Sequence, residues 1–352
     1  MKHNNNFDVI RLVAALFVIT SHAFWMTGKH TMEPLMVFSN NTTTISTIGL
    51  YMFFFTSGYL VTVSALASDN ARHFLVKRFL RIYPALIVVV LISVFIAGPL
   101  LTRLSTADYF QHPRTWAYLL NMAGIRKYFH LPGVFKGPQF YTDDFNGPLW
   151  TIGLELKLYI SLAILVAFGW IHNKKLHLLI CTSLITAALG IYIVRDYGFV
   201  PVRYIGQKDF LLMVSFYLGS MIVVGKPSIT FLKIAAAAAG IFLLLRLRGV
   251  LPNILVDEIV FYSLATYFLA FTKKFRVHIR NDISYGMYLV SMPVQQVCYI
   301  LSGYNTNPWF NIAVCLLPTI ILAWLSWKYI EQPCLQLKHL YRGHTSLARQ
   351  AV

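Results

Sequence analysis

Charged residues are scarce in this sequence. They make up 12% of its 352 residues, whereas hydrophobic residues make up 57%. In soluble globular domains about a quarter of the residues are charged. Disordered chains have few hydrophobic residues and many charged ones. The scarcity therefore excludes a soluble or disordered protein. We expect an all-α polytopic membrane protein, a bundle of transmembrane helices whose surroundings are mostly lipid.

Acidic residues are rarer than basic ones, and cysteines are few. The chain has 13 Asp and Glu against 30 Lys and Arg, a net charge of +17. In a soluble protein this excess would indicate nucleic acid; here basic cytoplasmic loops that orient helices explain it better, and no nucleic-acid partner is expected. The four cysteines show neither CxxC pairing nor histidines at metal spacing, so we expect no disulfide and no metal. They are Cys181, Cys298, Cys315 and Cys334.

Long apolar runs are what the sequence has in abundance. A span needs about 20 mostly apolar residues. The first run lacks a small-residue cleavage site and is expected to be a signal anchor. We predict a transmembrane domain over 1–335, followed by a basic cytoplasmic tail, 336–352. The ten predicted spans lie near 9–27, 45–66, 82–102, 148–170, 178–195, 206–224, 230–246, 252–272, 283–303 and 309–330.

The distribution of basic residues predicts the orientation. If the N-terminus is cytoplasmic, the inner segments hold about three times as many Lys and Arg as the short outer ones. Both termini are therefore expected in the cytoplasm. The segment 103–147 is too long and too aromatic for a bare linker. We expect it to fold over the outer face and to help bind a substrate.

One histidine and one acidic residue lie well inside predicted spans. Such groups are costly in a membrane, so each is a functional-site hypothesis. By this layout His22 is the histidine inside a span, roughly 8 Å below its outer end, and Glu155 is the acid, roughly 10 Å deep. A carboxylate beside an imidazole supports its protonated form, which a general base needs. The alternative is a polar pair that holds two helices together.

Arginines near the cytoplasmic side indicate an anion site. Arg11 shares a helix face with His22 and lies roughly 16 Å along the axis from it, unless it only snorkels or pairs with Asp8. Arg78 and Arg81 are three residues apart in the basic stretch before the third span, and two guanidiniums there suit phosphates. The alternative is ordinary positive-inside charge.

Six motifs together resemble the acyltransferase-3 family of membrane acyltransferases. They keep the family's order from end to end, although most are weak singly. The motifs are Phe7-Asp-Val-Ile-Arg11 through Ser21-His22; Phe53-Phe-Phe-Thr-Ser57-Gly58-Tyr59-Leu60; Lys77-Arg78-Phe-Leu-Arg81-Ile-Tyr83-Pro84; Asn146-Gly147-Pro148-Leu149-Trp150 leading to Glu155 and Tyr159; Ser284-Tyr285-Gly286-Met287-Tyr288-Leu289; and Glu331-Gln-Pro333.

The resemblance implies an enzyme that moves an acyl group, often acetyl, from cytoplasmic acyl-CoA to a hydroxyl of an envelope glycan or glycolipid. It implies a bacterial inner membrane and no permanently bound cofactor, with acyl-CoA as co-substrate. It also implies His22 as the catalytic residue and the Arg78 and Arg81 pair as part of the donor site. We expect Glu155 to orient or charge-stabilise His22. Donor-binding candidates are Arg11, Arg78, Arg81 and Tyr83, and substrate or oxyanion candidates are Ser57, Trp150, Tyr285 and Tyr288.

Several alternatives stay open at this point. Members often have a histidine soon after the Tyr-Leu of the ninth span, where this chain has Ser291. Acyl transfer is either direct or passes through an acylated His22. The acceptor, the acyl chain and the oligomeric state are undetermined. A proton-coupled transporter of a glycan or small anion is the main rival function, and a scaffold subunit is a weaker one.

Overall fold

The computed structural model describes residues 5–124, 128–196, 207–250, 256–274, 276–277 and 279–337. Over these residues every regular element is helical, and one isolated β-bridge joins Thr102 to Val134. The all-α prediction is therefore confirmed for the described part of the chain. The predicted basic tail, 336–352, lies outside it except for its first two residues.

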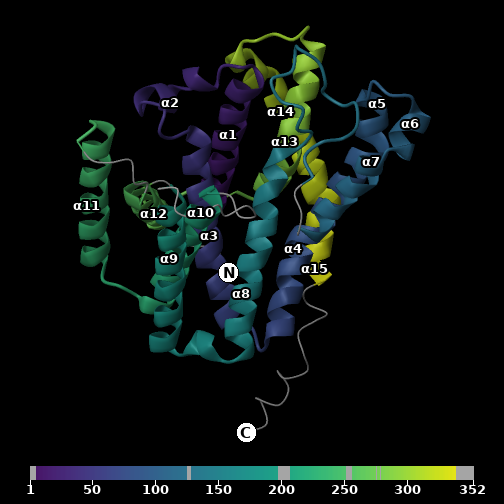
Figure 1. The fold of residues 1–352 in the computed structure, drawn as a ribbon. Coiled ribbons are helices and arrows are strands. Elements are labelled where there is room, and N and C mark those ends of the chain that lie inside the picture. The colour runs from purple at the N-terminus through teal and green to yellow at the C-terminus, as the bar shows by residue number, and fades with distance from the viewer. Residues whose placement is uncertain are drawn as a thin grey trace. The chain divides into compact units, whose positions relative to one another are not determined.

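A helix forms at each of the ten predicted span positions (Figure 1). Seven described helical segments are long and apolar enough to cross a membrane. The segments containing α10, α12 and α13 do not meet that standard, so ten spans and the orientation of the termini stay predictions. The ten helices are α1 (Phe7–Met26), α3 (Ile45–Leu66), α4 (Ala71–Ile92), α8 (Trp150–Ala167), α9 (Lys174–Asp196), α10 (Gln207–Gly225), α11 (Ile229–Leu247), α12 (Val256–Phe271), α13 (Ser284–Leu301) and α14 (Pro308–Ser326).

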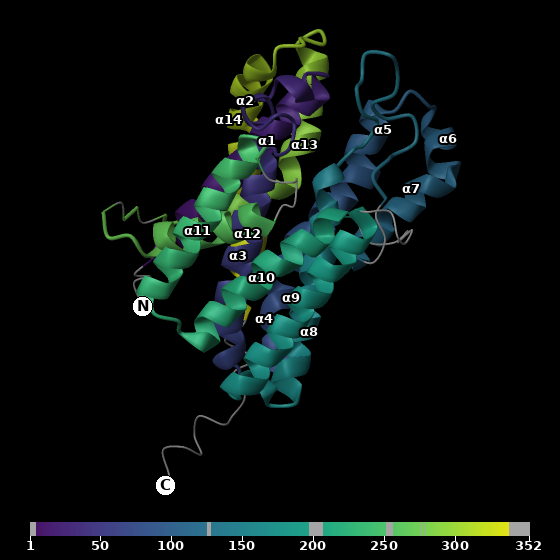
Figure 2. The same cartoon turned by 60° about the vertical axis from the view of Figure 1, so that its left-hand side comes forward.

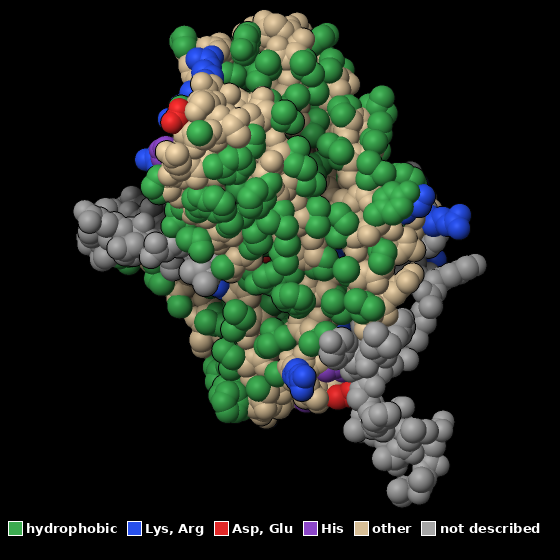
Figure 3. Space-filling model, turned by 90° about the vertical axis from the view of Figure 1, so that its right-hand side faces the viewer, with side chains coloured by type: hydrophobic (Ala, Val, Ile, Leu, Met, Phe, Trp, Pro, Cys, Tyr) green, Lys and Arg blue, Asp and Glu red, His purple; other side chains and the backbone are tan. Residues whose placement is uncertain are grey.

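The surface of the helices is strongly apolar. Hydrophobic side chains predominate on the face drawn in Figure 3. Large side chains such as Leu100, Leu301 and Leu317 are more than half exposed. Contiguous apolar surface of this kind is rare on soluble monomers but matches lipid tails. The structure and the composition agree on a multi-pass membrane protein.

The chain folds as two compact units. The first holds the residues up to Leu66 together with Phe168–Ser284, and it is built around α3. Helix α3 packs against α1 on one side and α10 on another, and α9 packs on α10 (Figure 2). Gly58 lets α3 and α10 touch, since a Cβ there would lie 1.9 Å from the carbonyl oxygen of Phe216. This explains the glycine of the Ser57-Gly58 motif by helix packing.

The second unit holds Ala67–Ala167 and the residues from Tyr285 onward. Its helix α4 starts at Ala71, eleven residues before the predicted start of the third span. The side chain of Asn70 caps it by accepting a hydrogen bond of 2.8 Å from the His73 N–H. Arg78 and Arg81, which precede the predicted span, therefore lie inside the helix. Basic residues indicate where a helix leaves the apolar part of the membrane, but the helix itself can continue beyond that point.

The long segment after α4 is folded, as predicted. A π-helical turn over Ser93–Ala97 and the short helix α5 (Gly98–Leu101) end α4. Short helices α6 (Thr106–Gln111) and α7 (Pro113–Ala117) follow. The buried hydroxyl of Tyr109 donates to the Val94 carbonyl over 3.0 Å, a carbonyl within the π turn. This bond ties the segment to the helix; its side of the membrane stays a prediction.

The end of α14 also departs from a regular helix. A π-helical turn, η6, covers Trp327–Glu331, and α15 (Gln332–Gln336) follows. A π turn inserts an extra residue and re-aims the side chains around it. Here it lies against α4 and carries Glu331, which is 1% exposed.

Candidate functional site

The second unit gathers most of the predicted site residues around α4. The guanidinium of Arg81 lies 3.2 Å from the carboxylate of Glu331, and these side chains are 15% and 1% exposed. The Ser326 hydroxyl donates to the other Glu331 oxygen over 3.1 Å. The Arg81 guanidinium also lies 5.8 Å from the ring centroids of both Tyr285 and Trp327. An ion pair and two aromatic rings thus hold Arg81 in one orientation.

Arg78 leads to Glu155 through Tyr159. The Arg78 guanidinium lies 5.9 Å from the Tyr159 ring centroid. The Tyr159 hydroxyl donates a hydrogen bond to the Glu155 carboxylate one helical turn away on α8. The charges of Arg81 and Glu155 both act on Arg78. The structure therefore brings Arg78, Arg81 and Glu155 into one electrostatic network. We call these three residues, together with Tyr159 and Glu331, the arginine cluster.

The two tyrosines of the motif on α13 hydrogen-bond to the backbone. The Tyr285 hydroxyl donates to the Ile82 carbonyl over 3.0 Å, which fixes α13 against α4. The Tyr288 hydroxyl donates to the Pro148 carbonyl over 3.0 Å and lies 2.6 Å from the Thr151 hydroxyl. Each hydroxyl has one proton to give. For either tyrosine to donate to an oxyanion, its hydroxyl must first break the hydrogen bond to the backbone carbonyl.

Two further predicted residues lie on these helices. Tyr83 is half-buried on α4 and stacks on Phe79, with ring centroids 4.5 Å apart. Trp150 is half-buried and begins α8. The preceding Asn146 is fully buried and donates to the Leu289 carbonyl over 2.8 Å. The motif around Trp150 therefore anchors the start of α8 on α13.

His22, Arg11 and Ser57 belong to the first unit. His22 and Arg11 are both half-buried on α1, so the helical spacing predicted for them is confirmed. Arg11 forms an ion pair with Asp282, and no bond to the alternative partner Asp8 is among its described contacts. Ser57 is half-buried on α3. Because Glu155 belongs to the second unit, the predicted pairing of His22 with Glu155 stays a prediction.

Ser21, the residue before His22, contacts a buried carboxylate. Ser21 donates to the Glu33 carboxylate over 2.8 Å and accepts from the Ser46 N–H over 2.7 Å. The Ile45 N–H also donates to Glu33, which is 2% exposed. Glu33 therefore joins the end of α1 to the start of α3, where it accepts from one of the backbone N–H groups that the start of a helix leaves open.

The sequence reasoning missed several buried ionisable residues. Glu331 was placed after the last span, and its partner Arg81 is 250 positions away. His177 was placed outside the spans but lies inside α9, fully buried, 3.0 Å from the Ser220 hydroxyl. Arg246 forms ion pairs with Asp257, at 3.0 Å, and with Glu258, which is fully buried. Only the Glu-Gln-Pro motif at Glu331 signalled any of these.

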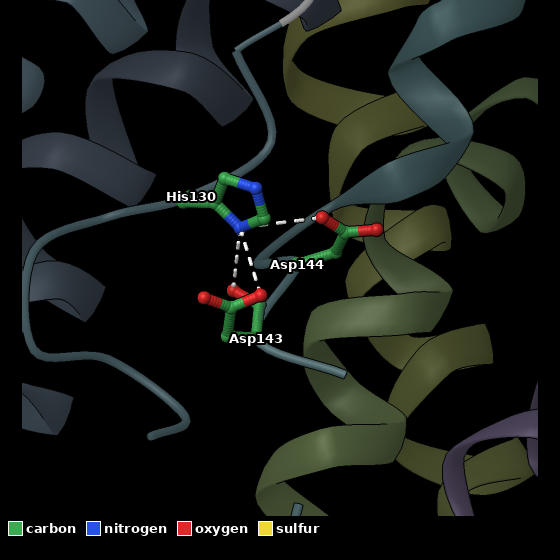
Figure 4. Close-up of side chains that lie close together, drawn as sticks. All are labelled: His130, Asp143 and Asp144. Atoms are coloured by element: carbon green, nitrogen blue, oxygen red, sulfur yellow. Dashed lines mark hydrogen bonds and ion pairs between the residues drawn. The ribbon is translucent and has the colours of Figure 1, made fainter. Parts of the chain in front are cut away.

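A separate cluster lies in the segment between α7 and α8. One ring nitrogen of His130 lies 3.2 Å from an Asp143 carboxylate oxygen and 3.3 Å from one of Asp144 (Figure 4). Partial burial raises the pKa of the Asp144 carboxyl, and the neighbouring His130 opposes that shift. None of the three residues was a candidate from the sequence.

Comparison with known proteins identifies the family. Residues 4–328 match the acyltransferase-3 family model, described as an acyltransferase domain. Nodulation protein 10 of Rhizobium leguminosarum bv. viciae is 31% identical, over 96% of this chain and 94% of that protein. The O-acetyl transferase of Shigella phage Sf6 is 25% identical, over 94% and 96%. The peptidoglycan O-acetyltransferase OatA of Listeria monocytogenes is 30% identical over 39% of this chain and 22% of its own.

No solved structure matches the chain. The family model nevertheless covers the first five of the six motifs, from the Arg11 and His22 pair on α1 to the motif on α13. Its span also includes Arg78, Arg81 and Glu155 of the arginine cluster. The chain therefore belongs to the acyltransferase-3 family of membrane acyltransferases and is an O-acyltransferase enzyme.

Proposed function

We propose that this enzyme transfers an acyl group, acetyl in the first instance, from acyl-CoA to a hydroxyl of a cell-envelope glycan or glycolipid. Two of the relatives are named as O-acetyl transferases, one of them a peptidoglycan O-acetyltransferase. A transporter would form no covalent product, and family membership removes the reason to prefer it. We place the protein in a bacterial inner membrane by the same analogy.

The arginine cluster is the observation that supports a phosphate-bearing donor. Coenzyme A carries phosphates at one end and the thioester at the other end of a long arm. A guanidinium has five N–H donors in a fixed fork, which suits phosphate oxygens. Glu331 engages the Nη1 atom of Arg81 and holds the guanidinium in place. Because Glu331 and Glu155 already offset the positive charge, donor recognition here would rely on oriented hydrogen bonds more than on net charge.

His22 is the proposed catalytic residue. As a base it takes the proton of the acceptor hydroxyl while that oxygen attacks the thioester carbonyl; the coenzyme A sulfur leaves and receives the proton from the imidazolium. In the two-step form, a ring nitrogen of His22 attacks the thioester first, coenzyme A leaves, and the hydroxyl then attacks the acyl-imidazole. Labelled acetyl-CoA without acceptor separates the routes, since only the second leaves label on the protein.

Donor binding tests the proposal. Purified protein in nanodiscs is titrated with acetyl-CoA and with coenzyme A, beside an Arg78→Ala/Arg81→Ala double variant. Arg72→Ala is the matched control, because Arg72 lies on the same helix but is exposed. We expect saturable binding that weakens at least tenfold in the double variant and stays unchanged in the control. Failure of folded wild-type protein to bind any acyl-CoA would contradict the proposed donor.

A further inference from the structure

We propose that His130, Asp143 and Asp144 form a binding site for one divalent transition-metal ion of the zinc type. The three side chains point toward one another from two stretches of the segment before α8 (Figure 4). Each offers one ligand atom, and the three atoms lie within 4.8 Å of one another. An imidazole nitrogen with carboxylate oxygens is a donor set that zinc accepts, whereas Ca²⁺ and Mg²⁺ prefer oxygen alone.

The distances fit a tetrahedral ion. Zinc bonds of about 2.0–2.1 Å to nitrogen and oxygen place neighbouring ligand atoms of a tetrahedron roughly 3.3–3.4 Å apart. The His130 ring nitrogen lies 3.2 Å from the Asp143 oxygen and 3.3 Å from the Asp144 oxygen. Two of the three edges therefore already have nearly the required length. Three protein ligands leave one position open, which is the arrangement of a zinc site that also takes water or a substrate oxygen.

Backbone contacts hold the ligands in place. The Phe145 N–H donates to the Phe129 carbonyl over 2.7 Å, so the neighbours of Asp144 and His130 are hydrogen-bonded to each other. Gln296 on α13 donates to the Asp144 carbonyl over 2.6 Å. On the other side of His130, the Asn121 amide bonds both backbone groups of Tyr128 at 2.7 and 3.1 Å. The site is therefore positioned before any ion arrives, which lowers the entropic cost of binding.

The surroundings suit a cation that enters from water. His130 and Asp143 are 40% and 48% exposed, and Asp144 is 19% exposed. Asp143 and Asp144 also line a cavity of about 500 Å³, together with Tyr141, Thr142 and Lys136. With a neutral imidazole the three ligands carry two negative charges, and Lys136 is the basic residue on the cavity wall. A divalent ion offsets both carboxylates, whereas a protonated His130 offsets only one.

Zinc binding to the full-length protein tests the proposal directly. The protein is purified with an affinity tag free of histidine, stripped with a chelator and titrated with ZnCl₂ by calorimetry, with equilibrium dialysis and elemental analysis for stoichiometry. The variants are His130→Gln and Asp143→Asn/Asp144→Asn. The control is His172→Gln, because His172 is an exposed histidine in the short helix after α8. Size-exclusion profiles confirm that each variant folds.

We expect one equivalent of saturable Zn²⁺, retained in a tenfold excess of Ca²⁺ or Mg²⁺. The His130 and Asp variants should bind at least tenfold more weakly, and His172→Gln should bind as wild type. Protease cleavage between residues 128 and 146 should slow when Zn²⁺ is present in wild type and in His172→Gln, but not in the His130 and Asp variants. Absence of saturable Zn²⁺ binding, or equal binding by folded His130→Gln, would overturn the proposal and leave the cluster an ordinary ion pair. Neither result depends on acyl transfer.

Discussion

Arg81 and Glu331 meet across 250 positions of sequence, with the Arg81 Nη1 atom 3.2 Å from the Glu331 carboxylate. A π-helical turn at the end of α14 presents Glu331, and α4 presents Arg81. Because Glu331 is 1% exposed, its carboxylate is shielded from water and is stabilised by Arg81 and by the Ser326 hydroxyl. The pair holds one of the two proposed donor-binding guanidiniums in a fixed orientation.

Replacing Glu331 by glutamine should therefore destabilise the second unit. Glu331→Gln keeps the side chain's shape but removes the charge that Glu331 supplies to Arg81, and breaking a buried pair from one side costs about 3 kcal/mol. We expect a lower melting temperature in detergent and weaker acetyl-CoA binding. The double variant Arg81→Met/Glu331→Gln should recover part of the stability but not the binding. A Glu331→Gln protein with the melting temperature of wild type would show that the ion pair contributes nothing to stability.

Gly58 should tolerate no side chain. A Cβ at this position would lie 1.9 Å from the Phe216 carbonyl oxygen, and backbone cannot yield as a flexible side chain can. We expect Gly58→Ala to cost about 1–3 kcal/mol of stability by forcing α3 and α10 apart. Gly190→Ala on α9 is the matched control, since nothing lies within 4 Å of its added Cβ. That substitution should be neutral or slightly stabilising; equal losses in both would refute the packing argument.

The ion pairs of Arg246 give a third test. Arg246 contacts both Asp257 and Glu258, and the Thr43 hydroxyl donates to Glu258 over 3.1 Å. Arg246→Met should lower stability by about 3 kcal/mol or more, because Glu258 is fully buried. Adding Glu258→Gln to that variant should restore part of the loss. Thermal unfolding of the single and double variants measures the coupling, and purely additive losses would contradict it.

Regular elements followed closely from the sequence. The predicted span 45–66 coincides with α3, Ile45–Leu66, because this stretch is mostly apolar and holds no charged residue. Helix α4 starts eleven residues before the predicted third span. Its basic residues signalled a membrane edge, but the structure compensates Arg81 with Glu331, a partner that local sequence cannot indicate.

The candidate site was predictable in its residue types more than in its contacts. The family motifs singled out Arg78, Arg81 and Glu155, which the structure joins into one network. The expected Asp8 alternative for Arg11 was not found, and Asp282 is its partner. The His130 cluster was missed because its ligands lie 13 positions apart in an irregular segment. Only the folded path of that segment brings them together.

Acyl transfer by His22 variants tests the central claim most directly. Wild-type protein in nanodiscs is given radiolabelled acetyl-CoA and a panel of envelope glycans, beside His22→Ala and the exposed-histidine control His172→Gln. A general base contributes about a hundredfold to ten-thousandfold. We predict that His22→Ala loses at least a hundredfold in transfer rate while binding acetyl-CoA as wild type does, and that His172→Gln keeps full activity. A folded His22→Ala protein that transfers acetyl at the wild-type rate would contradict both the direct and the two-step mechanism.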